Sequence, residues 1–548
     1  MFNLPTSIGE LRGAEFVNRR VIQIPPTREI NAGNFFRSDQ TFRFNIAGNS
    51  WWSPSQSYFR IRARLVDGKS KPLLGRSDIA PSFCFVDTLY RSCAFSMNGV
   101  RVSSINDYVP QIAALKNRHG KSKDYRRGVG NSLGFYDTDF KARQARVVSD
   151  GLLDETKSVL YSGTDLGFSF GGNDAKVGII AANAGGNSLP IHLETKSAGG
   201  ASHPTLSVGD VVYLTLGAAA NESQVLRITG IITTQGVLAN VPNKYAIESL
   251  NGTAPIAVAS ANMDADNFRV RRFLETKSDA AGSFECVWQP PLGIVDCHHY
   301  LPAGQYEYSF SPQQAETAYQ LCVESSSAKT QGANADFQLF MDSIELYVIT
   351  VEQARVDSLD YLIDLKEVSC TPFTLTTNSW SSNMLIVPPS TSRLTVAYQD
   401  TQVASSTAFP ITKFLSGADL QNTLTRFNLT YANVVYPSND LDLAKTTATN
   451  TNPSVSHFTS AYMDMLLANG SAFSDTTSEN LTDWLGNGLY LSYPTHKEAK
   501  DTSTQVVVKQ SFSGAIPNTQ LLLFAHYNTI TSVSIKSGQV VAVSSVDA

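Results

Sequence analysis

The chain has 548 residues, several times the size of an ordinary domain, so we expect two or more hydrophobic cores. Hydrophobic residues make up 42% of the chain and charged residues 17%, a composition that excludes an intrinsically disordered protein. Gly, Ser, Thr, Asn and aromatic residues are plentiful, whereas long Glu- and Lys-rich runs are scarce. This balance favours a mainly β protein.

The net charge of -5 conceals a gradient along the chain. Residues 1–150 carry 23 Lys and Arg against 12 Asp and Glu, residues 151–356 carry 11 against 21, and residues 357–548 carry 9 against 15. The gradient predicts a basic face or end, where a nucleic acid or an acidic partner subunit could bind.

The six cysteines are too few for a disulfide framework, and none forms a C-x-x-C pair, so we expect free, mostly buried thiols. The N-terminus has no basic segment followed by an apolar run, and no stretch of about 18 apolar residues occurs. We therefore expect a soluble protein that is made in the cytosol and has no membrane span.

The first strands follow a basic N-terminal arm. Strands are predicted at 42–46 and 58–66, and the second of these alternates apolar and basic residues. One of its faces carries Phe59, Ile61, Ala63 and Leu65, and the other carries Arg60, Arg62 and Arg64. The cationic face has two readings, a solvated strand surface or a surface turned toward phosphate.

A hairpin, a helix and a basic run come next. Asn98-Gly99 lies between two apolar runs, which is the strongest local signal for a tight hairpin. A short helix is predicted over 108–116. The run 116–127 (KNRHGKSKDYRR) then holds six basic residues and one acid, and is either a solvated loop or a contact to nucleic acid.

The composition from about 150 to 266 shifts toward Gly, Ala, Asn and Thr, with short strands between turn residues, which predicts a small β-rich module inserted into a larger one. Strand patterns of the larger module resume at 268–274, 284–288 and 301–312. The strand-rich stretch 337–356 precedes 357–368, where Leu359, Leu362, Ile363 and Leu365 recur at helical spacing and predict a linking helix.

A second strand-rich block follows this predicted link. Strands are expected at 373–375, 384–387, 393–398, 424–435, 505–512, 520–526 and 533–535, with short helices at 457–468 and 478–485. We therefore predict two antiparallel sandwiches in tandem, one formed by residues 1–356 and including the insertion, the other by residues 357–548.

No pattern that carries catalytic or cofactor chemistry is complete. Both Gly-Lys-Ser triplets lack the earlier glycine of a phosphate loop, because those positions are Ala63 and Leu115. His298-His299 would point to opposite faces of a strand and have no third metal ligand nearby. We expect no cofactor, no metal site and no enzymatic activity.

The order of segments resembles the double jelly-roll major capsid proteins of small double-stranded DNA viruses, namely those of Polinton-like viruses, adintoviruses and virophages. The resemblance is carried by VDTLYRSCAFSMNGVRVSS, by LPAGQYEYSFSP with FMDSIELYVITVEQARV, and by LYLSYPTHKE with STQVVVKQSFSGAIPNTQLLLFAHYNTITSVS. It implies a homotrimer that forms a pseudo-hexagonal capsomer in the virion, next to other capsomers, penton and minor capsid proteins. It implies no catalytic residues.

The basic N-terminal third is the predicted genome-facing side, where contact with packaged DNA would be independent of sequence. Its candidate residues are Arg12, Arg19, Arg20, Lys116, Arg118, Lys121, Lys123, Arg126 and Arg127. The main alternative function is a carbohydrate-binding or glycoside-processing β-sandwich, because jelly rolls also serve lectins and hydrolases. A minor virion component such as a penton is a third possibility, although one jelly roll usually suffices for that role.

Overall fold

The structure is a computed structural model that describes most of the chain in segments. The described residues are 18–30, 35–67, 79–132, 134–140, 143, 158–162, 176–180, 190–196, 206, 209–215, 223–233, 243–249, 255, 257, 268–273, 283–297, 299–313, 323–325, 337–352, 358–404, 410–417, 420, 424–441, 443, 454–472, 479–486, 488–495, 504–513, 518–536 and 539–547.

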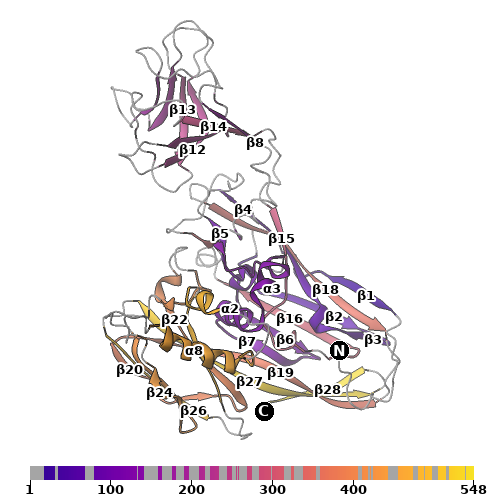
Figure 1. Ribbon diagram of the computed structural model, residues 1–548. Coiled ribbons are helices and arrows are strands. Elements are labelled where there is room, and N and C mark those ends of the chain that lie inside the picture. Colours follow the sequence, from indigo (N-terminus) through magenta and orange to yellow (C-terminus); the bar gives the residue numbers. More distant parts are fainter. Residues whose placement is uncertain are drawn as a thin grey trace.

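The first sandwich consists of two antiparallel sheets (Figure 1). One contains, in spatial order, β1 (Arg19–Ile24), β18 (Phe337–Glu352), β4 (Tyr58–Asp67) and β15 (Ser283–Trp288), with β3 (Ser50–Trp52) also pairing with β18. The other contains β2 (Gln40–Ile46), β16 (Gly304–Pro312), β6 (Tyr90–Met97) and β7 (Val100–Ile105). The short β5 (Ala80–Pro81) and β17 (Val323–Glu324) pair separately.

The second sandwich is built in the same way. Its first sheet contains β19 (Ser358–Thr374), β27 (Thr519–Lys536), β22 (Thr391–Asp400) and β25 (Tyr490–Pro494), with β28 (Gln539–Asp547) also pairing with β27. Its second sheet contains β20 (Ser379–Ser381), β26 (Thr504–Phe512), β23 (Leu424–Tyr431) and β24 (Val434–Leu441), with β21 (Leu385–Val387) also pairing with β26.

Both sandwiches share one strand order. When the eight main strands of each are counted along the chain, one sheet holds the first, eighth, third and sixth strands, and the other holds the second, seventh, fourth and fifth. This alternation between two sheets is the jelly-roll arrangement. The predicted fold, two jelly rolls in tandem, is confirmed.

The helices of the two jelly rolls occupy equivalent places. In the first, α2 (Val109–Gly120), α3 (Lys123–Arg127) and α4 (Val129–Ser132) follow the fifth strand, β7. In the second, α8 (Ser454–Ala468) and α9 (Leu481–Gly486) follow the fifth strand, β24. Short helical turns in the described segments also include α1 (Phe85–Thr88), η2 (Pro54–Gln56) and η6 (Thr401–Ala404). The predicted helix at 108–116 is confirmed and extends to Gly120.

The predicted insertion forms a separate sheet with its own core. Its seven strands run in the order β8 (Ser158–Ser162), β14 (Phe268–Phe273), β11 (Val211–Thr215), β12 (Ser223–Thr233), β13 (Asn243–Ser249), β10 (His192–Lys196) and β9 (Lys176–Ile180). The sheet projects away from both jelly rolls (Figure 1). Strand β14 was expected in the larger module but pairs with β8 and β11, because periodicity does not reveal which strand is the partner.

Aromatic side chains fill the first jelly roll. Trp52 is fully buried, packs edge-on against Phe44 with ring centroids 5.0 Å apart, and donates its indole N–H to Ser57 Oγ at 2.8 Å. Tyr90 stacks on Trp288 with ring centroids 5.1 Å apart. Five of the six cysteines lie in described segments; none of these five forms a disulfide and four of them are buried, as expected.

The predicted linking helix at 357–368 is wrong. These residues form the start of β19, which pairs with β27 along its whole length, from Ser358 opposite Lys536 to Thr374 opposite Gln520. Ile363 and Leu365 are buried, whereas Leu362 is 63% exposed, so burial alternates with the period of a strand. Long-range pairing with β27 therefore overrides the helical spacing of the leucines.

Two further strand predictions differ from the structure, and one turn is confirmed. The stretch 424–435 is a hairpin, since Ala432 and Asn433 take positive φ values of 49° and 66° between β23 and β24. The stretches 520–526 and 533–535 belong to one continuous strand, β27. The predicted turn at Asn98-Gly99 joins β6 and β7, with φ values of 47° and 81°.

Two leucines of β19 distinguish the strand from the helix. We expect Leu365→Ala, at a buried position, to lower the free energy of unfolding by about 2–5 kcal/mol. Leu362→Ala, at an exposed position, should change it by no more than about 0.5 kcal/mol. Urea unfolding of both variants measures the difference in the free energy of unfolding. Equal losses would instead indicate that both leucines lie on one buried face, as they would in a helix.

Candidate functional site

The outer face of β4 carries the alternating arginines that the sequence singled out. Arg60 donates to Glu285 Oε2 at 2.7 Å, and Arg62 approaches the same oxygen at 3.1 Å. Arg64 lies 3.0 Å from Asp342 and 5.1 Å from the ring centroid of Phe340. The predicted alternation is confirmed, but two carboxylates already neutralise most of this cationic face.

The same neutralisation extends through the first jelly roll. Among the described residues, further ion pairs join basic residues of the N-terminal third to acids of residues 285–352, namely Arg20 with Glu352, Arg43 with Glu307, Lys116 with Asp296, and Arg143 with Glu324. The charge gradient of the sequence is thus in part a complementarity between neighbouring strands and loops. The surface is less basic than the count of residues 1–150 predicts.

Three candidate genome-facing residues are not free surface cations. Arg118 is only 1% exposed and Arg126 only 3%, so neither side chain can reach a polyanion outside the protein. Lys116 is 21% exposed and binds Asp296 at 2.7 Å and the carbonyl of Pro291 at 3.0 Å. The run 116–127 is basic as a whole, but the helices α2 and α3 that it forms turn Arg118 and Arg126 inward.

The other candidates differ in their surroundings. Arg19 and Arg20 are exposed on the edge strand β1, where Arg20 pairs with Glu352 at 2.6 Å. Lys121 is exposed at the end of α2 and lies 5.0 Å from the ring centroid of Tyr125. Arg12 and the side chains of Lys123 and Arg127 lie outside what the structure describes.

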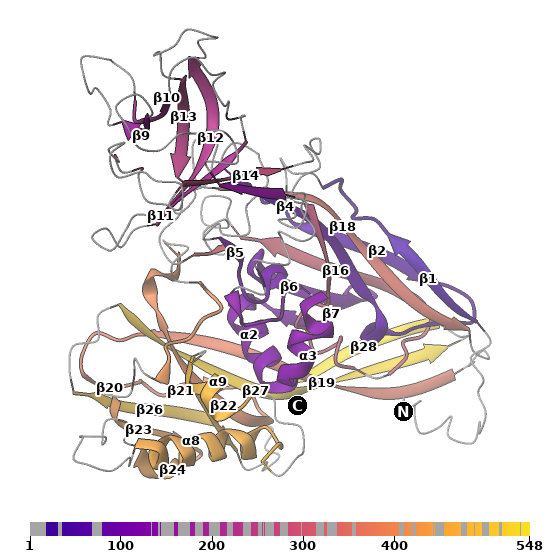
Figure 2. The same cartoon turned by 45° about the horizontal axis from the view of Figure 1, so that its top comes forward.

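Arg118 joins the two jelly rolls. Helix α2 lies where the sandwiches meet (Figure 2). From it, Arg118 Nη2 donates to Glu479 Oε1 at 3.0 Å and to the carbonyl of Gly488 at 2.7 Å, and its guanidinium lies 4.9 Å from the ring centroid of Tyr490. Glu479 is fully buried. A fully desolvated ion pair of this kind penalises any arrangement that leaves one charge alone.

Two histidines and a second arginine surround this pair. His119 packs against Tyr490 and His526, with ring centroids 4.6 Å and 5.7 Å apart. Arg393 Nη2 donates to His526 Nδ1 at 2.8 Å. We call Arg118, His119, Arg393, Glu479, Tyr490 and His526 the junction cluster. Its members come from distant parts of the sequence, so no local pattern could have identified Arg393, Glu479 or His526.

Further polar contacts cross the junction at other points. Glu367 of β19 is 4% exposed and accepts a hydrogen bond from Ser103 Oγ of β7 at 2.5 Å. Burial raises the pKa of the Glu367 carboxyl to about 7, against the smaller opposite effect of the Ser103 hydrogen bond. Asn98 of the β6–β7 turn donates to the carbonyl of Val540 in β28 at 2.8 Å.

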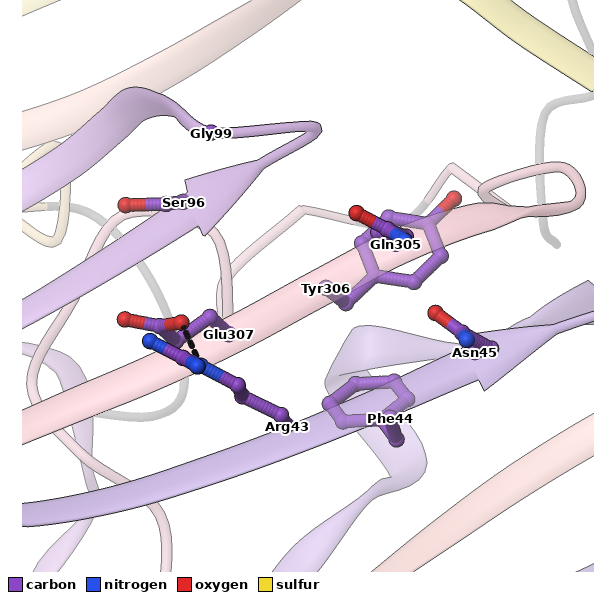
Figure 3. A pocket seen from close by; sticks show the side chains of 8 residues that line it. All are labelled: Arg43, Phe44, Asn45, Ser96, Gly99, Gln305, Tyr306 and Glu307. Atoms are coloured by element: carbon purple, nitrogen blue, oxygen red, sulfur yellow. Dashed lines mark hydrogen bonds and ion pairs between the residues drawn. The ribbon is translucent and has the colours of Figure 1, made fainter. Parts of the chain in front are cut away.

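A depression of about 450 Å³ lies on the sheet that contains β2, β16 and β6 (Figure 3). Its residues are Arg43, Phe44, Asn45, Ser96, Gly99, Gln305, Tyr306 and Glu307. Glu307 is the only carboxylate among them and is paired with Arg43. Canonical glycoside hydrolysis uses two carboxylates, so the lining does not supply that machinery.

Each jelly roll has an edge strand with two adjacent exposed aliphatic residues. On β1 these are Val21, 56% exposed, and Ile22, 40% exposed. On β24 they are Val434, 43% exposed, and Val435, 42% exposed. Unpaired edges with apolar side chains are sites where another chain can add.

Within the described segments, no group of three or more His, Cys, Asp or Glu side chains is arranged to hold a metal ion. No helix in the part of the chain that the structure describes is long and apolar enough to cross a membrane. His299 is described but His298 is not, so the adjacent pair cannot be compared as a unit.

Solved structures similar to this chain align with nearly its whole length. The Sputnik virophage structure from electron cryomicroscopy has 10% identity, with 97% of this chain and 88% of that chain covered and a TM-score of 0.45. The mavirus major capsid protein has 9% identity, 97% and 91% coverage and a TM-score of 0.36. The Faustovirus major capsid protein has 8% identity, 94% and 90% coverage and a TM-score of 0.40. No family model and no curated protein matches the sequence.

The Arg118–Glu479 pair provides a test of the junction. We expect Arg118→Met or Glu479→Met alone to lower the free energy of unfolding by about 3–5 kcal/mol, because each leaves an uncompensated buried charge. The double variant should lose less than the sum of the two. Arg43→Met, at the exposed pair with Glu307, is the control and should cost about 1 kcal/mol or less. Additive losses in denaturant unfolding would show that the two charges do not interact.

Proposed function

We propose that this protein is a major capsid protein, a structural and non-catalytic component of the virion of an icosahedral double-stranded DNA virus. Three copies assemble into a pseudo-hexagonal capsomer, which contacts neighbouring capsomers and the penton and minor capsid proteins. This role follows from the resemblance in the order of segments, and the double jelly-roll topology supports it. The two jelly rolls correspond to residues 1–356 and 357–548.

The observation that carries the proposal is the identical strand order of the two sandwiches. Each also has its helices after the fifth strand. A subunit made of two similar wedges offers similar outlines on two sides, so three copies related by a threefold axis present six similar sides. Such a trimer can occupy a lattice position with six neighbours.

The exposed edges are the proposed contacts between copies. Edge strand β1 with Val21 and Ile22 belongs to the first jelly roll, and edge strand β24 with Val434 and Val435 belongs to the second. A head-to-tail contact joins two different surfaces and closes into a ring if the rotation allows it. Burial of these aliphatic residues favours such a contact.

Non-specific contact with packaged DNA is proposed for the part of the basic region that remains exposed. Arg19 and Arg20 on β1 and Lys121 at the end of α2 are the candidates with exposed side chains. Electrostatic binding to phosphates requires accessible cations, not a defined sequence. Arg118 and Arg126, being buried, are no longer included.

The alternative is a carbohydrate-binding or glycoside-processing protein. The depression beside Tyr306 and Glu307 favours it only weakly, since Tyr306 is 2% exposed and Phe44 5% exposed. Buried rings cannot stack on a sugar from the surface. The single carboxylate of the lining is likewise insufficient for the usual two-carboxylate hydrolysis.

Solution mass tests the assembly. Light scattering of the full-length protein should give three times the mass of one chain, and negative-stain microscopy should show particles of hexagonal outline or closed shells. Val434→Lys with Val435→Lys should lower the assembled fraction, because both charges would have to be desolvated in the contact. Ile231→Lys, 46% exposed in the inserted sheet, is the matched control. A stable monomer that binds glycans would instead establish the alternative.

A single charge reversal tests the contact with DNA. Arg19→Glu should weaken binding to double-stranded DNA of arbitrary sequence. It should also reduce the slope of log affinity against log salt concentration by the amount that corresponds to about one phosphate contact. Arg269→Glu, at an exposed arginine of the inserted sheet, should leave binding unchanged. Fluorescence anisotropy over a series of salt concentrations measures both effects. Equal behaviour of the two variants would rule out Arg19 as a contact to DNA.

A further inference from the structure

The junction cluster contains two buried histidines that are not placed to carry a second proton. Both ring nitrogens of His119 are buried without a hydrogen-bond partner within the described residues. His526 has partners, but they fix its neutral form. Because Arg393 has only N–H donors, His526 Nδ1 must accept, and the ring proton is on Nε2, which lies 3.3 Å from Thr395 Oγ1.

Protonation of either ring therefore conflicts with its surroundings. A proton on His526 Nδ1 would face the N–H of Arg393 and remove the only acceptor of that hydrogen bond. A charged His119 would find no acceptor at either nitrogen. An unsatisfied buried charge costs far more than a lost neutral hydrogen bond.

The charges around the two histidines are predominantly positive. Glu479 and Asp483 are the carboxylates near the cluster, and Glu479 already accepts from Arg118 and from the hydroxyl of Tyr490. The charged groups that act on the histidines are Arg118 and Lys116 on α2 and Arg393 on β22. Tyr490 on β25 packs against His119, and Arg126 on α3, Glu479 before α9 and Asp483 on α9 lie farther out around Arg118 and Tyr490.

We propose that His119 and His526 form an acid-sensitive latch between the two jelly rolls. Both rings are neutral while α2 is docked on the second jelly roll, and acidification releases α2 by protonating them. Solvent then reaches the two rings and the Arg118–Glu479 pair. The latch is a property of the chain itself, and it would also loosen a capsid if the proposed function holds.

The charges around the two histidines give the direction in which docking of α2 depends on pH. Burial, and after it Arg393, His526 and Arg118, hold the pKa of His119 well below its usual value, and burial with Arg393 and Lys116 does the same for His526. A group with a lowered pKa in the docked state binds fewer protons there than in the open state. Docking is therefore favoured above about pH 6.5 and is weakened as the pH falls below it.

The size of the effect follows from the same linkage. Between about pH 7.5 and 5.5, each histidine that stays neutral when docked and titrates normally when open changes the opening equilibrium by about tenfold. The two together change it by about 100-fold.

Titration of Glu367 changes the opening equilibrium in the opposite direction to the two histidines. It therefore has to be eliminated from the measurement. The carboxyl pKa of Glu367, raised to about 7, means that the docked state holds a proton that the open state releases. Stability from Glu367 is therefore present at low pH and lost as the pH rises through about 7. Glu367→Gln keeps an acceptor for Ser103 and does not titrate, so it is the background for the experiment.

Hydrogen exchange of the full chain tests the latch. In the Glu367→Gln protein, peptides from α2, β22 and β25 should lose about 100-fold in protection between about pH 7.5 and 5.5, after correction for intrinsic exchange rates. Adding His119→Phe, which keeps the ring against Tyr490, and His526→Gln, which keeps an acceptor for Arg393, should abolish this loss. His192→Gln, at a buried histidine of the inserted sheet, is the control and should leave the loss unchanged.

The outcomes separate the latch from other causes. The latch is wrong if acidification leaves α2 protected in the Glu367→Gln protein, or if the two histidine substitutions leave the loss intact. Should the double substitution not fold, ring signals of isotope-labelled histidine decide, because a latch histidine stays neutral until α2 exchanges. A ring that titrates near its usual value while α2 remains protected would overturn the inference. Exchange is measured on unassembled protein, so a failure here says nothing against the capsid role.

Discussion

The antiparallel pairing of β18 with β4 and β1 is the contact on which the first jelly roll depends. It joins residues 19–67 to residues 337–352, so the first jelly roll closes only after almost two thirds of the chain has been made. The charges follow this pairing, since arginines of β1, β2 and β4 meet acids from residues 285–352. Part of the charge gradient that suggests a basic face in the sequence therefore pairs neighbouring strands with one another.

The second jelly roll repeats the topology of the first but not its chemistry. The first core is rich in aromatic rings, whereas the central strands of the second carry aliphatic runs such as Leu521, Leu522 and Leu523 in β27, all buried. Either kind of side chain can fill the space between two sheets, because burial depends on volume and apolar area more than on identity. This freedom explains why two halves with one strand order show no internal sequence repeat.

Local signals predicted much of the fold. Asn98-Gly99, the alternation along β4 and the start of α2 were all visible in the sequence, because each depends on residues within one turn or strand. The linking helix was wrong because the leucines of β19 fit helical spacing, and only the distant strand β27 selects the extended form. The junction cluster could not be predicted at all, since Arg118 and Glu479 are 361 residues apart. For the same reason the sequence suggests that Arg118 is a surface charge, because its buried partner Glu479 lies so far away in the chain.

The helical segments, more than the sheets, supply the charged part of the junction. Arg118 and His119 come from α2, after the fifth strand of the first jelly roll, and Glu479 comes from the equivalent segment of the second. Desolvation offsets much of the attraction between Arg118 and Glu479, so the pair adds less to stability than its geometry suggests. Its effect is on register, because a shift of α2 by one turn would leave both charges buried and alone. The equivalent loops of two similar sandwiches thus select a single relative orientation, which an apolar contact of the same area would define less sharply.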